Sequence, residues 1–415
     1  MGKIKVGVVG VGRGGMMMSY CEKEQHAKLV AICDKWAEGL EIKKNELNDP
    51  DISYYTDYED FLKHDMDVVM LANYAHQHAP FAIKAMKAGF HVISEVLPCL
   101  TMKEAVELIE TIEQTGKTYC YAENFCYMPG PYEMRRLYKS GVIGELDYCE
   151  GEYVHNCEDG WTSLTYGDPN HWRNLMHSTF YCTHSLGPLV HISGQRPVRV
   201  SGFEFLFNDA NVRMGRKCRG GLEMVTFEGG ATGKSIHGDL QRNNISYIIY
   251  GTKGRLETAR ECTQTGDVSK IYVEYNEIEG DYSTCRRELY DPKDDKWEVA
   301  KQFGHGGSDY YCIWNALEKV AGNPDADAID VYEAMDMYLP GMFAHRSILA
   351  GGIPMDIPDL RDAAEHDKWR NDTTCVIPEV AGDMLVPAYS KGDIPIPDEV
   401  YERRRREWQQ HHTQR

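Results

Sequence analysis

The first part of the chain alternates short apolar runs with helix-like stretches. The apolar runs that predict buried strands are IKVGVV (4–9), KLVAIC (28–33), DVVMLA (67–72), HVIS (91–94) and TYCYAEN (118–124). Helical stretches such as TMKEAVELIETIEQTG (101–116) separate them, and this one ends at a glycine typical of a helix C-cap. Continuous apolar strands alternating with helices indicate βαβ units and a parallel sheet. We therefore expect a doubly wound α/β domain over residues 1–124.

The pattern changes after about residue 145. Strand-like runs joined by glycine-rich turns follow one another at ELDYCEGEYVHN (145–156), VRVSGFEFLF (198–207), GLEMVTFEGG (221–230), ATGKSIHGDL (231–240) and ISYIIYGTKGRLE (245–257). Helical periodicity returns in SDYYCIWNALEKVAG (308–322) and in the segment from residue 330 to residue 351. Few helices interrupt the strands, which predicts a large, open, mostly antiparallel sheet. We expect an α+β domain over residues 125–361 that binds substrate and makes oligomer contacts.

A C-terminal extension is expected over residues 362–415. It is rich in proline and charge, and it ends in the basic run YERRRREWQQHHTQR (401–415). Such a run is more typical of a solvated end or an oligomer arm than of a binding motif.

Composition narrows the classes of function. The formal net charge of −19 disfavours binding to nucleic acid or to an anionic membrane surface. No apolar run approaches the roughly 20 residues of a membrane-spanning helix, and the N-terminus enters a strand pattern without a signal peptide. Thirteen cysteines without a C-x-x-C pair indicate reduced thiols rather than a zinc or disulfide framework. We expect a cytoplasmic enzyme without a metal site.

The first apolar strand leads into a glycine-rich loop. Gly10, Gly12 and Gly15 form G-x-G-x-x-G between a strand and a helix. Gly10 is expected to make the tight turn, Gly12 to let a pyrophosphate approach the backbone, and Gly15 to let helix and strand pack closely. Asp34 follows the next strand, where an acid suits ribose hydroxyls and repels a 2′-phosphate. The arrangement predicts NAD, and Lys35 leaves some room for NADP.

Segments spread over residues 1–361 carry a family resemblance. They are GVVGVGRGG (7–15), AICD (31–34), NYAHQHAPFAIKAMKAGFHVISE (73–95), AENFCYMP (122–129), SGVIGEL (140–146) and GTKGRLE (251–257). Together they resemble the Gfo/Idh/MocA family of NAD(P)-dependent sugar oxidoreductases. The resemblance implies a Rossmann domain that carries the cofactor and a second domain whose open sheet covers the nicotinamide and often makes subunit contacts. A homodimer or homotetramer acting on a small sugar or glycoside is therefore expected.

One position departs from this family. Its members usually have Glu-Lys-Pro where this chain has EVLP (95–98), so the glutamate is kept and Val96 replaces the lysine. That lysine often assists proton transfer from the substrate hydroxyl, so the usual proton-transfer route is not expected here. The expected cofactor contacts are the glycine loop, Asp34, and the side chains of Arg13, Asn73, His78, Glu95 and Asn124.

A subgroup of the family shows the same departure. The NAD-dependent glycosidases of the α-N-acetylgalactosaminidase type are similar to this chain at AEN (122–124), GEYVHN (151–156), HWRN (171–174), FYCTHSLGP (180–188), GHGGSDY (304–310) and PMDIPD (354–359). The resemblance implies oxidation of the sugar at carbon 3, elimination of the aglycone across carbons 1 and 2, addition of water and return of the hydride. Related bacterial proteins stop after the oxidation and release a 3-keto glycoside. The motif residues of the subgroup fall on Glu123, His155, Arg173, Tyr181, His184 and Tyr310.

The segment STFYCTHSLGPLVH (178–191) contains the catalytic candidates. His184 is expected to accept the hydroxyl proton, because an unperturbed imidazole titrates near neutral pH. Tyr181 precedes it by three residues, so the two share a face if the segment is helical, and the phenol can relay the proton or bind the oxygen at carbon 3. The alternative for His184 is a histidine hydrogen-bonded within a helix.

The remaining candidates are expected to hold the sugar. Arg173 suits charge-assisted hydrogen bonds and Trp172 a stacking platform, with core packing as the alternative for the tryptophan. Glu123 and His155 are expected to act as a second acid/base group or to bind hydroxyls, and Tyr310 to contact the substrate.

Three functions remain open at this point. We favour an NAD-dependent oxidoreductase that converts a sugar or glycoside to its 3-keto form, because residues 160–173 depart from the hydrolase subgroup. A glycoside hydrolase that oxidises carbon 3 only transiently is the alternative. A catalytically silent sugar or NAD sensor is the third possibility, and the retained glycine loop, Tyr181 and His184 weaken it.

Overall fold

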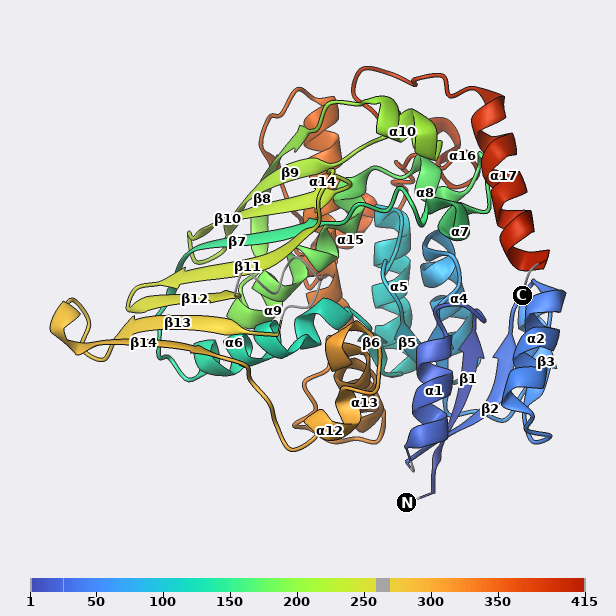
Figure 1. Ribbon diagram of the computed structural model, residues 1–415, viewed down its shortest axis with the longest axis horizontal. Helices are drawn as coiled ribbons and strands as arrows, with labels where there is room; N and C mark the ends of the chain where they lie inside the picture. Colours follow the sequence, from blue (N-terminus) through green and yellow to red (C-terminus); the bar gives the residue numbers. More distant parts are fainter. Residues whose placement is uncertain (1, 25, 259–268, 414–415) are drawn as a thin grey trace. The chain divides into compact units, whose positions relative to one another are not determined.

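The computed structural model describes residues 2–24, 26–258 and 269–413. Contacts divide the chain into two compact units, each with one sheet (Figure 1). Unit 1 comprises Met1–Tyr127, Asp294–Met335 and Leu360–Asp372, and unit 2 comprises Met128–Lys293, Asp336–Asp359 and Thr373–Arg415. The division falls inside the long helix α14 (Val331–Leu349).

Unit 1 contains a six-stranded parallel sheet in the order β3-β2-β1-β4-β5-β6. Its strands are β1 (Ile4–Val9), β2 (Ala27–Cys33), β3 (Ser53–Tyr55), β4 (Val68–Leu71), β5 (His91–Ser94) and β6 (Tyr119–Tyr121). Its N-terminal helices are α1 (Gly15–Lys23), α2 (Ala37–Leu47), α3 (Tyr58–Phe61), α4 (His78–Lys87) and α5 (Met102–Thr115), with the short 3-10 turns η1 (Ala75–Gln77) and η2 (Asn124–Tyr127). This strand order is that of a dinucleotide-binding Rossmann sheet, which confirms the predicted doubly wound fold.

Local sequence explains why these elements form. All four residues of β4 are buried, as expected for a strand covered on both faces. Helix α5 begins at Thr101, whose hydroxyl accepts the N–H of Glu104, and ends at Gly116 in the left-handed conformation. The predicted C-cap glycine is thereby confirmed.

The C-terminal half of the chain also contributes to unit 1. The added elements are α12 (Trp297–Ala300), η5 (His305–Gly307), α13 (Ser308–Val320) and α15 (Ala363–Trp369). The Ile329 carbonyl accepts the backbone N–H of Tyr121 in β6, and Tyr310 packs on Tyr20 of α1. A distant stretch of sequence thus completes the first unit.

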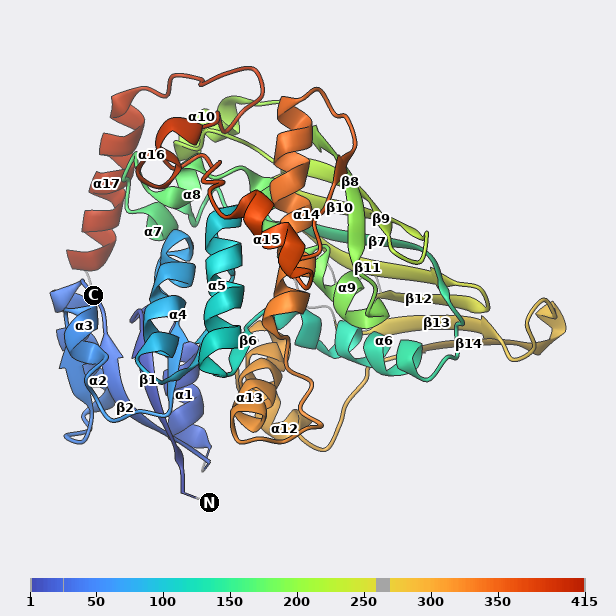
Figure 2. The ribbon, with the colours of Figure 1, turned by 180° about the vertical axis from the view of Figure 1, so that it is seen from behind.

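Unit 2 contains a nine-stranded sheet in the order β14-β13-β12-β11-β7-β10-β9-β8-β15. The strands are β7 (Leu146–Val154), β8 (Pro197–Glu204), β9 (Gly221–Phe227), β10 (Thr232–Gly238), β11 (Asn244–Gly251), β12 (Gly254–Thr258), β13 (Ile271–Asn276), β14 (Cys285–Tyr290) and β15 (Met355–Asp356). The pair of β7 and β10 is parallel and the other pairs are antiparallel, so the predicted mostly antiparallel sheet is confirmed. Helices α9 and α14 cover one face, seen from behind in Figure 2.

Unit 2 also contains helices that lie on a face or at the ends of this sheet. They are α6 (Pro129–Lys139), α7 (Trp161–Thr165), α8 (Trp172–Leu175), α9 (Gly187–Ser193), α10 (Asp209–Met214), α16 (Pro378–Ala381) and α17 (Asp398–Thr413), with the 3-10 segments η3 (Ser178–His184), η4 (Tyr282–Thr284) and η6 (Gly382–Met384). Helix α17 contains the basic run that was expected to be a solvated end or an oligomer arm. The helix packs on α7 and α10 of its own chain, where the ring of Tyr401 is buried at Gly215, while Arg403, Arg405 and Arg406 are exposed.

Two further features concern membrane-spanning helices and cysteines. Among the described residues, no helix is both long enough and apolar enough to cross a membrane. Every cysteine in that part of the chain is a free thiol.

Candidate active site

The glycine loop of unit 1 has the shape of a phosphate cradle. Gly10 has a φ of +101°, and a Cβ there would lie 2.5 Å from the Ala72 carbonyl oxygen, so only glycine fits. The Cβ position of Gly12 has no neighbouring atom within 4 Å, which leaves open space against the backbone. The loop therefore fits a pyrophosphate at the start of α1.

The role predicted for Gly15 is wrong. A Cβ at Gly15 would meet nothing within 4 Å, whereas a Cβ at Gly14 would lie 2.2 Å from the Gly10 carbonyl oxygen and 2.5 Å from Cγ1 of Val8. Close packing of helix on strand thus depends on Gly14. The motif spacing alone does not show this, because Gly14 and Gly15 are adjacent and only the loop path distinguishes them.

Asp34 lies at the end of β2 and supports the loop. Its carboxylate accepts the backbone N–H of Val11 and that of Trp36, each at 2.9 Å. The oxygens keep further lone pairs for ribose hydroxyls. Lys35, its neighbour, lies with Nζ 4.4 Å from the ring centroid of Tyr74.

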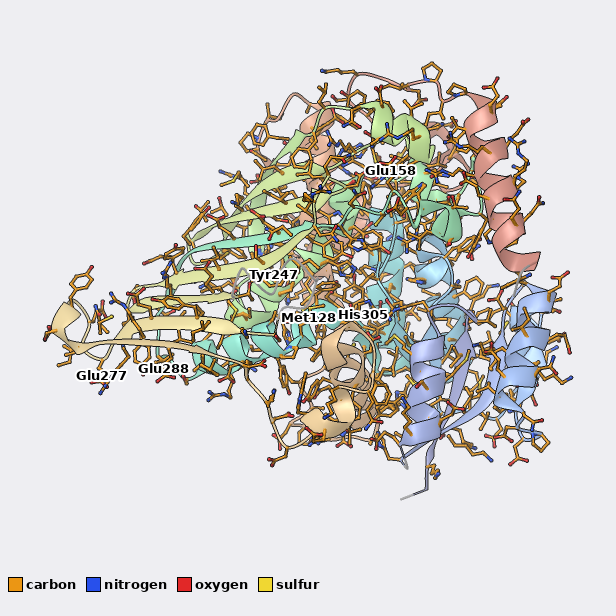
Figure 3. The ribbon with its side chains drawn as sticks, viewed as in Figure 1. Met128, Glu158, Tyr247, Glu277, Glu288 and His305 are labelled. Atoms are coloured by element: carbon orange, nitrogen blue, oxygen red, sulfur yellow. The ribbon has the colours of Figure 1, made fainter. Side chains whose placement is uncertain are left out.

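Arg13 connects the loop to two buried carboxylates. Its Nε donates to Glu95 at 2.6 Å, and its Nη1 and Nη2 donate to both oxygens of Asp309 at 3.0 and 2.9 Å. Asn124 Nδ2 and His305 Nδ1 also contact Asp309, at 3.1 Å each. Burial alone would raise the pKa of Asp309, but His305 and Arg13 hold it well below its usual range. The predicted residues Arg13 and Asn124 thus meet on Asp309, an acid that the sequence analysis did not single out, and Glu95 joins them through Arg13. His305, which also contacts Asp309, is labelled in Figure 3.

His78 and Asn73 are placed differently from the other expected cofactor contacts. The ring of His78 is buried, and its two nitrogens lie 2.9 Å from the Leu97 carbonyl and 3.2 Å from the Asn73 carbonyl. Burial lowers the pKa of His78 to about 4, so the ring is neutral at pH 7. His78 therefore links the loop after β4 to the loop after β5. The side-chain amide of Asn73 donates to Gln77 in the first of these loops.

Glu123 and Tyr310 also lie in unit 1. Glu123 is fully buried and accepts the N–H of Phe125 at 3.1 Å. Tyr310 packs between Tyr20 and Phe303, with ring centroids 5.6 and 5.3 Å away, and burial raises its pKa to about 12. Both side chains belong to unit 1, whereas the other predicted substrate residues belong to unit 2.

That cluster is built on η3 in unit 2. The predicted helical segment is a 3-10 helix that begins after His177, whose Nδ1 accepts the N–H of Thr179. Two glycines in neighbouring elements allow close packing against this turn. A Cβ at Gly151 of β7 would lie 1.9 Å from the Ser185 carbonyl oxygen, and one at Gly341 of α14 would lie 1.9 Å from that of Thr179.

Tyr181 and His184 share one side of the turn, as the spacing predicted. Their ring centroids are 5.4 Å apart, and the ring of Tyr153 lies 4.8 Å from that of His184. His237 on β10 stacks on Tyr153 at 5.0 Å and lies 5.7 Å from Tyr181. The His184 carbonyl accepts the hydroxyl of Tyr247, a residue of β11 labelled in Figure 3.

A cavity opens beside this turn, within unit 2. It is lined by Tyr153, His155, Cys157, Trp161, Trp172, Arg173, Met176, His177, Ser178, Tyr181, Arg216, His237 and Gly238. Four predicted residues, His155, Trp172, Arg173 and Tyr181, therefore meet there, and His184 lies against two of its wall rings. Trp172 is buried but lines the cavity, stacked on Tyr181 at 6.1 Å.

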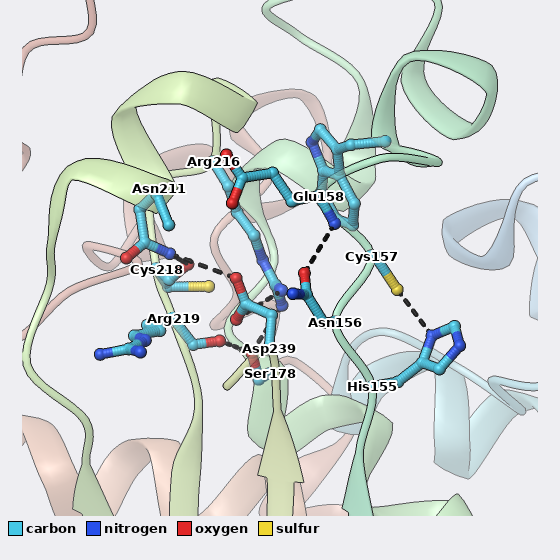
Figure 4. A network of polar contacts seen from close by, with 12 residues as sticks. His155, Asn156, Cys157, Glu158, Ser178, Asn211, Arg216, Cys218, Arg219 and Asp239 are labelled. Carbon is cyan, nitrogen blue, oxygen red and sulfur yellow. Dashed lines mark hydrogen bonds and ion pairs between the residues drawn. The ribbon is translucent and has the colours of Figure 1, made fainter. Parts of the chain in front are cut away.

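Figure 4 shows a network of polar contacts that includes the cavity residues His155, Cys157, Ser178 and Arg216. Arg216 forms an ion pair with Asp239 at 3.1 Å and donates to the hydroxyl of Ser178. His155 Nδ1 lies 2.8 Å from Sγ of Cys157 at the rim. Within the described part of the chain, no group of three or more His, Cys, Asp or Glu side chains is arranged to hold a metal ion.

The sequence reading missed His237 and Arg216. Both belong to segments without a motif: strand pairing brings His237 to the turn, and Arg216 reaches it from the loop after α10. His237 faces inward opposite Gly221 in the pairing of β10 with β9, a position that strand alternation in ATGKSIHGDL could have flagged.

Comparison with known proteins places both parts of the chain. Residues 4–123 match the NAD-binding Rossmann fold of the Gfo/Idh/MocA oxidoreductase family, and residues 242–369 match the C-terminal domain of glycosyl hydrolase 109. The chain combines these two family domains. Residues 4–123 are therefore an NAD-binding Rossmann domain of the oxidoreductase type, and the glycine loop described above lies within it.

Relatives and solved structures agree with this assignment. A glycosyl hydrolase family 109 protein of Shewanella sp. strain W3-18-1 is 26% identical, with 89% of this chain and 87% of that protein covered. The WlbA dehydrogenase of Bordetella pertussis, solved with NADH and UDP-GlcNAcA, shares the fold at 18% identity and a TM-score of 0.66, over 86% of this chain and 98% of its own. The UDP-N-acetylglucosamine 3-dehydrogenase of Acidithiobacillus ferrooxidans does so at 16% identity and a TM-score of 0.63, over 84% and 98%.

The two matched ranges leave the cavity of unit 2 outside them. The NAD-binding loop, Asp34 and Glu95 lie within the oxidoreductase match, whereas the cavity residues from Tyr153 to Gly238 lie between the two matches. The two family matches therefore do not cover the residues that line this cavity.

Proposed function

We propose that this enzyme oxidises the carbon-3 hydroxyl of a sugar or glycoside to a ketone. The observation that carries the proposal is the Tyr181–His184 turn, with its two rings 5.4 Å apart beside a cavity of aromatic and hydrogen-bonding side chains. An alcohol oxidation needs a hydride acceptor and a proton acceptor. The NAD-binding domain accounts for the first and this turn for the second.

The chain's own residues handle the proton and the orientation of the sugar. Tyr181 lines the cavity, so its phenol binds the reacting hydroxyl, and His184 behind it takes the proton as the carbonyl forms. Trp172 offers an aromatic face to the apolar side of a pyranose. NAD, when bound, accepts the hydride. The position that holds lysine in most of the family is Val96 here, which leaves this task to the histidine and tyrosine.

A glycoside hydrolase is the second candidate function. The glycosyl hydrolase 109 match and the relatives named for that family favour it. In that reaction the ketone acidifies carbon 2, a base removes its proton, the aglycone leaves, water adds and the hydride returns. His155, exposed at the cavity rim, is the candidate for the additional acid/base group.

One incubation separates these functions. The enzyme is mixed with 4-nitrophenyl glycosides, with and without added NAD, and products are identified by mass spectrometry. Net NADH and a 3-keto product support the oxidoreductase. Release of 4-nitrophenol without added NAD supports the hydrolase. Neither product, with sugar and NAD binding intact, overturns both proposals in favour of a sensor.

We also infer a cytoplasmic homodimer or homotetramer. Along β9 the side chains alternate, and those of Leu222, Met224 and Thr226 are half-exposed on one face of the sheet. Such a face suits contact with a second copy. Light scattering coupled to size exclusion tests the association, and a monomer at micromolar concentration would contradict it.

A further inference from the structure

The cavity beside η3 is cationic in a chain that is strongly acidic. Two arginines line it, and none of its described lining residues is Asp or Glu. The whole chain has a net charge of −19, so this local excess of positive charge is not a consequence of composition.

The charge that is not balanced belongs to Arg173. Arg216 has its counter-ion in Asp239, at 3.1 Å. Among the described residues, Arg173 has no carboxylate partner: its guanidinium lies 4.3 Å from the ring centroid of Trp172 and 5.3 Å from that of Tyr181. Both rings fix the orientation of the guanidinium plane without neutralising it.

The neighbouring polar groups are also without partners. Nε of Arg216, Nε1 of Trp172 and both ring nitrogens of His237 are buried and make no hydrogen bond in the structure. Burial, together with nearby His184 and Arg216, lowers the pKa of His237 well below its ordinary value, so His237 adds no charge. The cavity thus offers hydrogen-bond donors and one free cation, and its natural complement is a ligand rich in acceptors and negatively charged.

We propose that the sugar substrate carries an anionic oxygen substituent, a carboxylate or a sulfate ester, which binds Arg173. This inference rests on the proposed function and specifies its substrate class. Arg173 and His184 both lie against the ring of Tyr181, so one pyranose can place its substituent on the first and its carbon-3 hydroxyl towards the second. A planar carboxylate at carbon 6 and a sulfate at oxygen 6 share the required chemistry.

The test compares three 4-nitrophenyl glycosides that differ only at carbon 6: the glucoside, the glucuronide and the glucoside 6-sulfate. The wild-type enzyme is expected to have a kcat/KM for at least one anionic glycoside about ten- to a hundredfold above that for the glucoside. Which anionic compound is preferred identifies carboxylate or sulfate as the partner.

Substitutions assign the preference to Arg173. In Arg173→Ala the preference is expected to disappear through a higher KM for the anionic glycoside, and Arg173→Lys is expected to restore part of it. Arg286→Ala, which removes an exposed arginine paired with Glu277 in the same unit, is the matched control and leaves the preference unchanged. Thermal unfolding of each variant shows that the fold is kept.

The outcomes separate this inference from the proposed function. Turnover of the glucoside that equals or exceeds turnover of both anionic glycosides overturns the anionic class while the oxidation of sugars stands. An equal loss for all three compounds in Arg173→Ala does the same. If no compound is turned over, the proposed function fails, and calorimetric titration with free glucuronate, glucose 6-sulfate and glucose still decides the anion preference.

Discussion

His184 is buried against Tyr181 and Tyr153, so its imidazole is shielded from bulk water, as its proposed role of proton acceptor requires. We predict that His184→Ala keeps NAD but lowers kcat by about 10²- to 10⁴-fold, because general-base assistance is lost. NAD content after gel filtration and steady-state turnover measure the two effects. Turnover equal to that of the wild type would remove His184 from the mechanism.

Asp34 has two tasks that one substitution disturbs together. Its carboxylate accepts the N–H groups of Val11 and Trp36, and its oxygens keep further lone pairs for the expected ribose hydroxyls. We predict that Asp34→Ala weakens NAD binding by about ten- to a hundredfold and reduces the ratio of the affinity for NAD to the affinity for NADP. Titration of cofactor-free enzyme measures both. The exposed Asp65→Ala, which removes a carboxylate paired with Lys5, serves as control and is expected to bind NAD normally.

Glu223 on β9 makes stability depend on pH. Burial raises its pKa to about 8, whereas the unfolded chain releases this proton near pH 4.5. The favourable contribution is therefore complete below the unfolded-state pKa and is lost as the pH rises through about 8. We predict that the free energy of unfolding of the wild type falls with pH between about pH 5 and pH 8, and that Glu223→Gln lacks this part of the pH dependence. The slopes of the two proteins are expected to differ by about 1 kcal/mol per pH unit. Denaturation is measured at several pH values. If the free energies of unfolding of the two proteins change with pH in parallel, a buried, protonated Glu223 is ruled out.

Local motifs predicted the parts of the site that short stretches of chain build. Gly10, Gly12 and Asp34 sit in one βαβ unit, so spacing connects them, whereas Tyr181 and His184, which share one turn, are candidates through the family resemblance and the chemistry of imidazole and phenol. Asp309 lies 296 residues from Arg13, its ion-pair partner, and no spacing rule connects them. His237 reaches the same turn only through strand pairing. The site beyond its motifs is therefore a property of the tertiary fold.

Helix α17 supports two sides of the cavity. The Tyr401 hydroxyl donates to the Gly215 carbonyl at 2.9 Å, next to Arg216, and Arg404 donates to the hydroxyl of Thr162, next to Trp161. Gly215 has a φ of +80°, and a Cβ there would lie 2.6 Å from the Tyr401 ring, so this contact needs glycine. The basic helix is thus a brace for the wall formed by Trp161 and Arg216.

We predict that Tyr401→Ala raises the KM for glycosides about tenfold while NAD binding is unchanged, because Trp161 and Arg216 lose their support. Loss of a buried aromatic ring costs about 3–5 kcal/mol of local stability, so limited proteolysis is expected to cut near α17. Arg406→Ala, on an exposed position of the same helix, is the control. Early cleavage at α17 with an unchanged KM would contradict the bracing role.

At the level of elements, periodicity predicted more than composition did. The buried runs of unit 1 and the alternating strands of unit 2 were recognisable because their environments differ, covered on both faces in one sheet and half-exposed in the other. The docking of α17 was not predicted, since its sequence has many charges and a single buried tyrosine decides where it lies. The pattern of charged residues indicates which face of a helix is exposed to solvent, but it does not indicate where the opposite face packs.

Unit 1 is assembled from three separate segments of the chain, which bears on the boundary predicted near residue 124. The first segment keeps the glycine loop, Asp34 and Glu95, but Asp309, which pairs with Arg13, and Tyr310, which covers Tyr20, come from beyond residue 294. A fragment of residues 1–124 would expose the Tyr20 ring and leave Arg13 with one carboxylate instead of two.

We predict that this fragment unfolds at a lower temperature than the full chain and binds NAD at least about tenfold more weakly, because a charge-assisted pair and an aromatic cluster are lost. Circular dichroism melting and calorimetric titration with NAD give the comparison. In the full chain, Asp309→Asn is expected to reproduce part of the loss in NAD affinity without unfolding the protein, since it weakens the contacts of Asp309 with Arg13 and His305 but leaves the rest of unit 1 complete. A fragment that melts cooperatively and binds NAD as the full chain does would mean that residues 294–335 only cover a unit that residues 1–124 already complete.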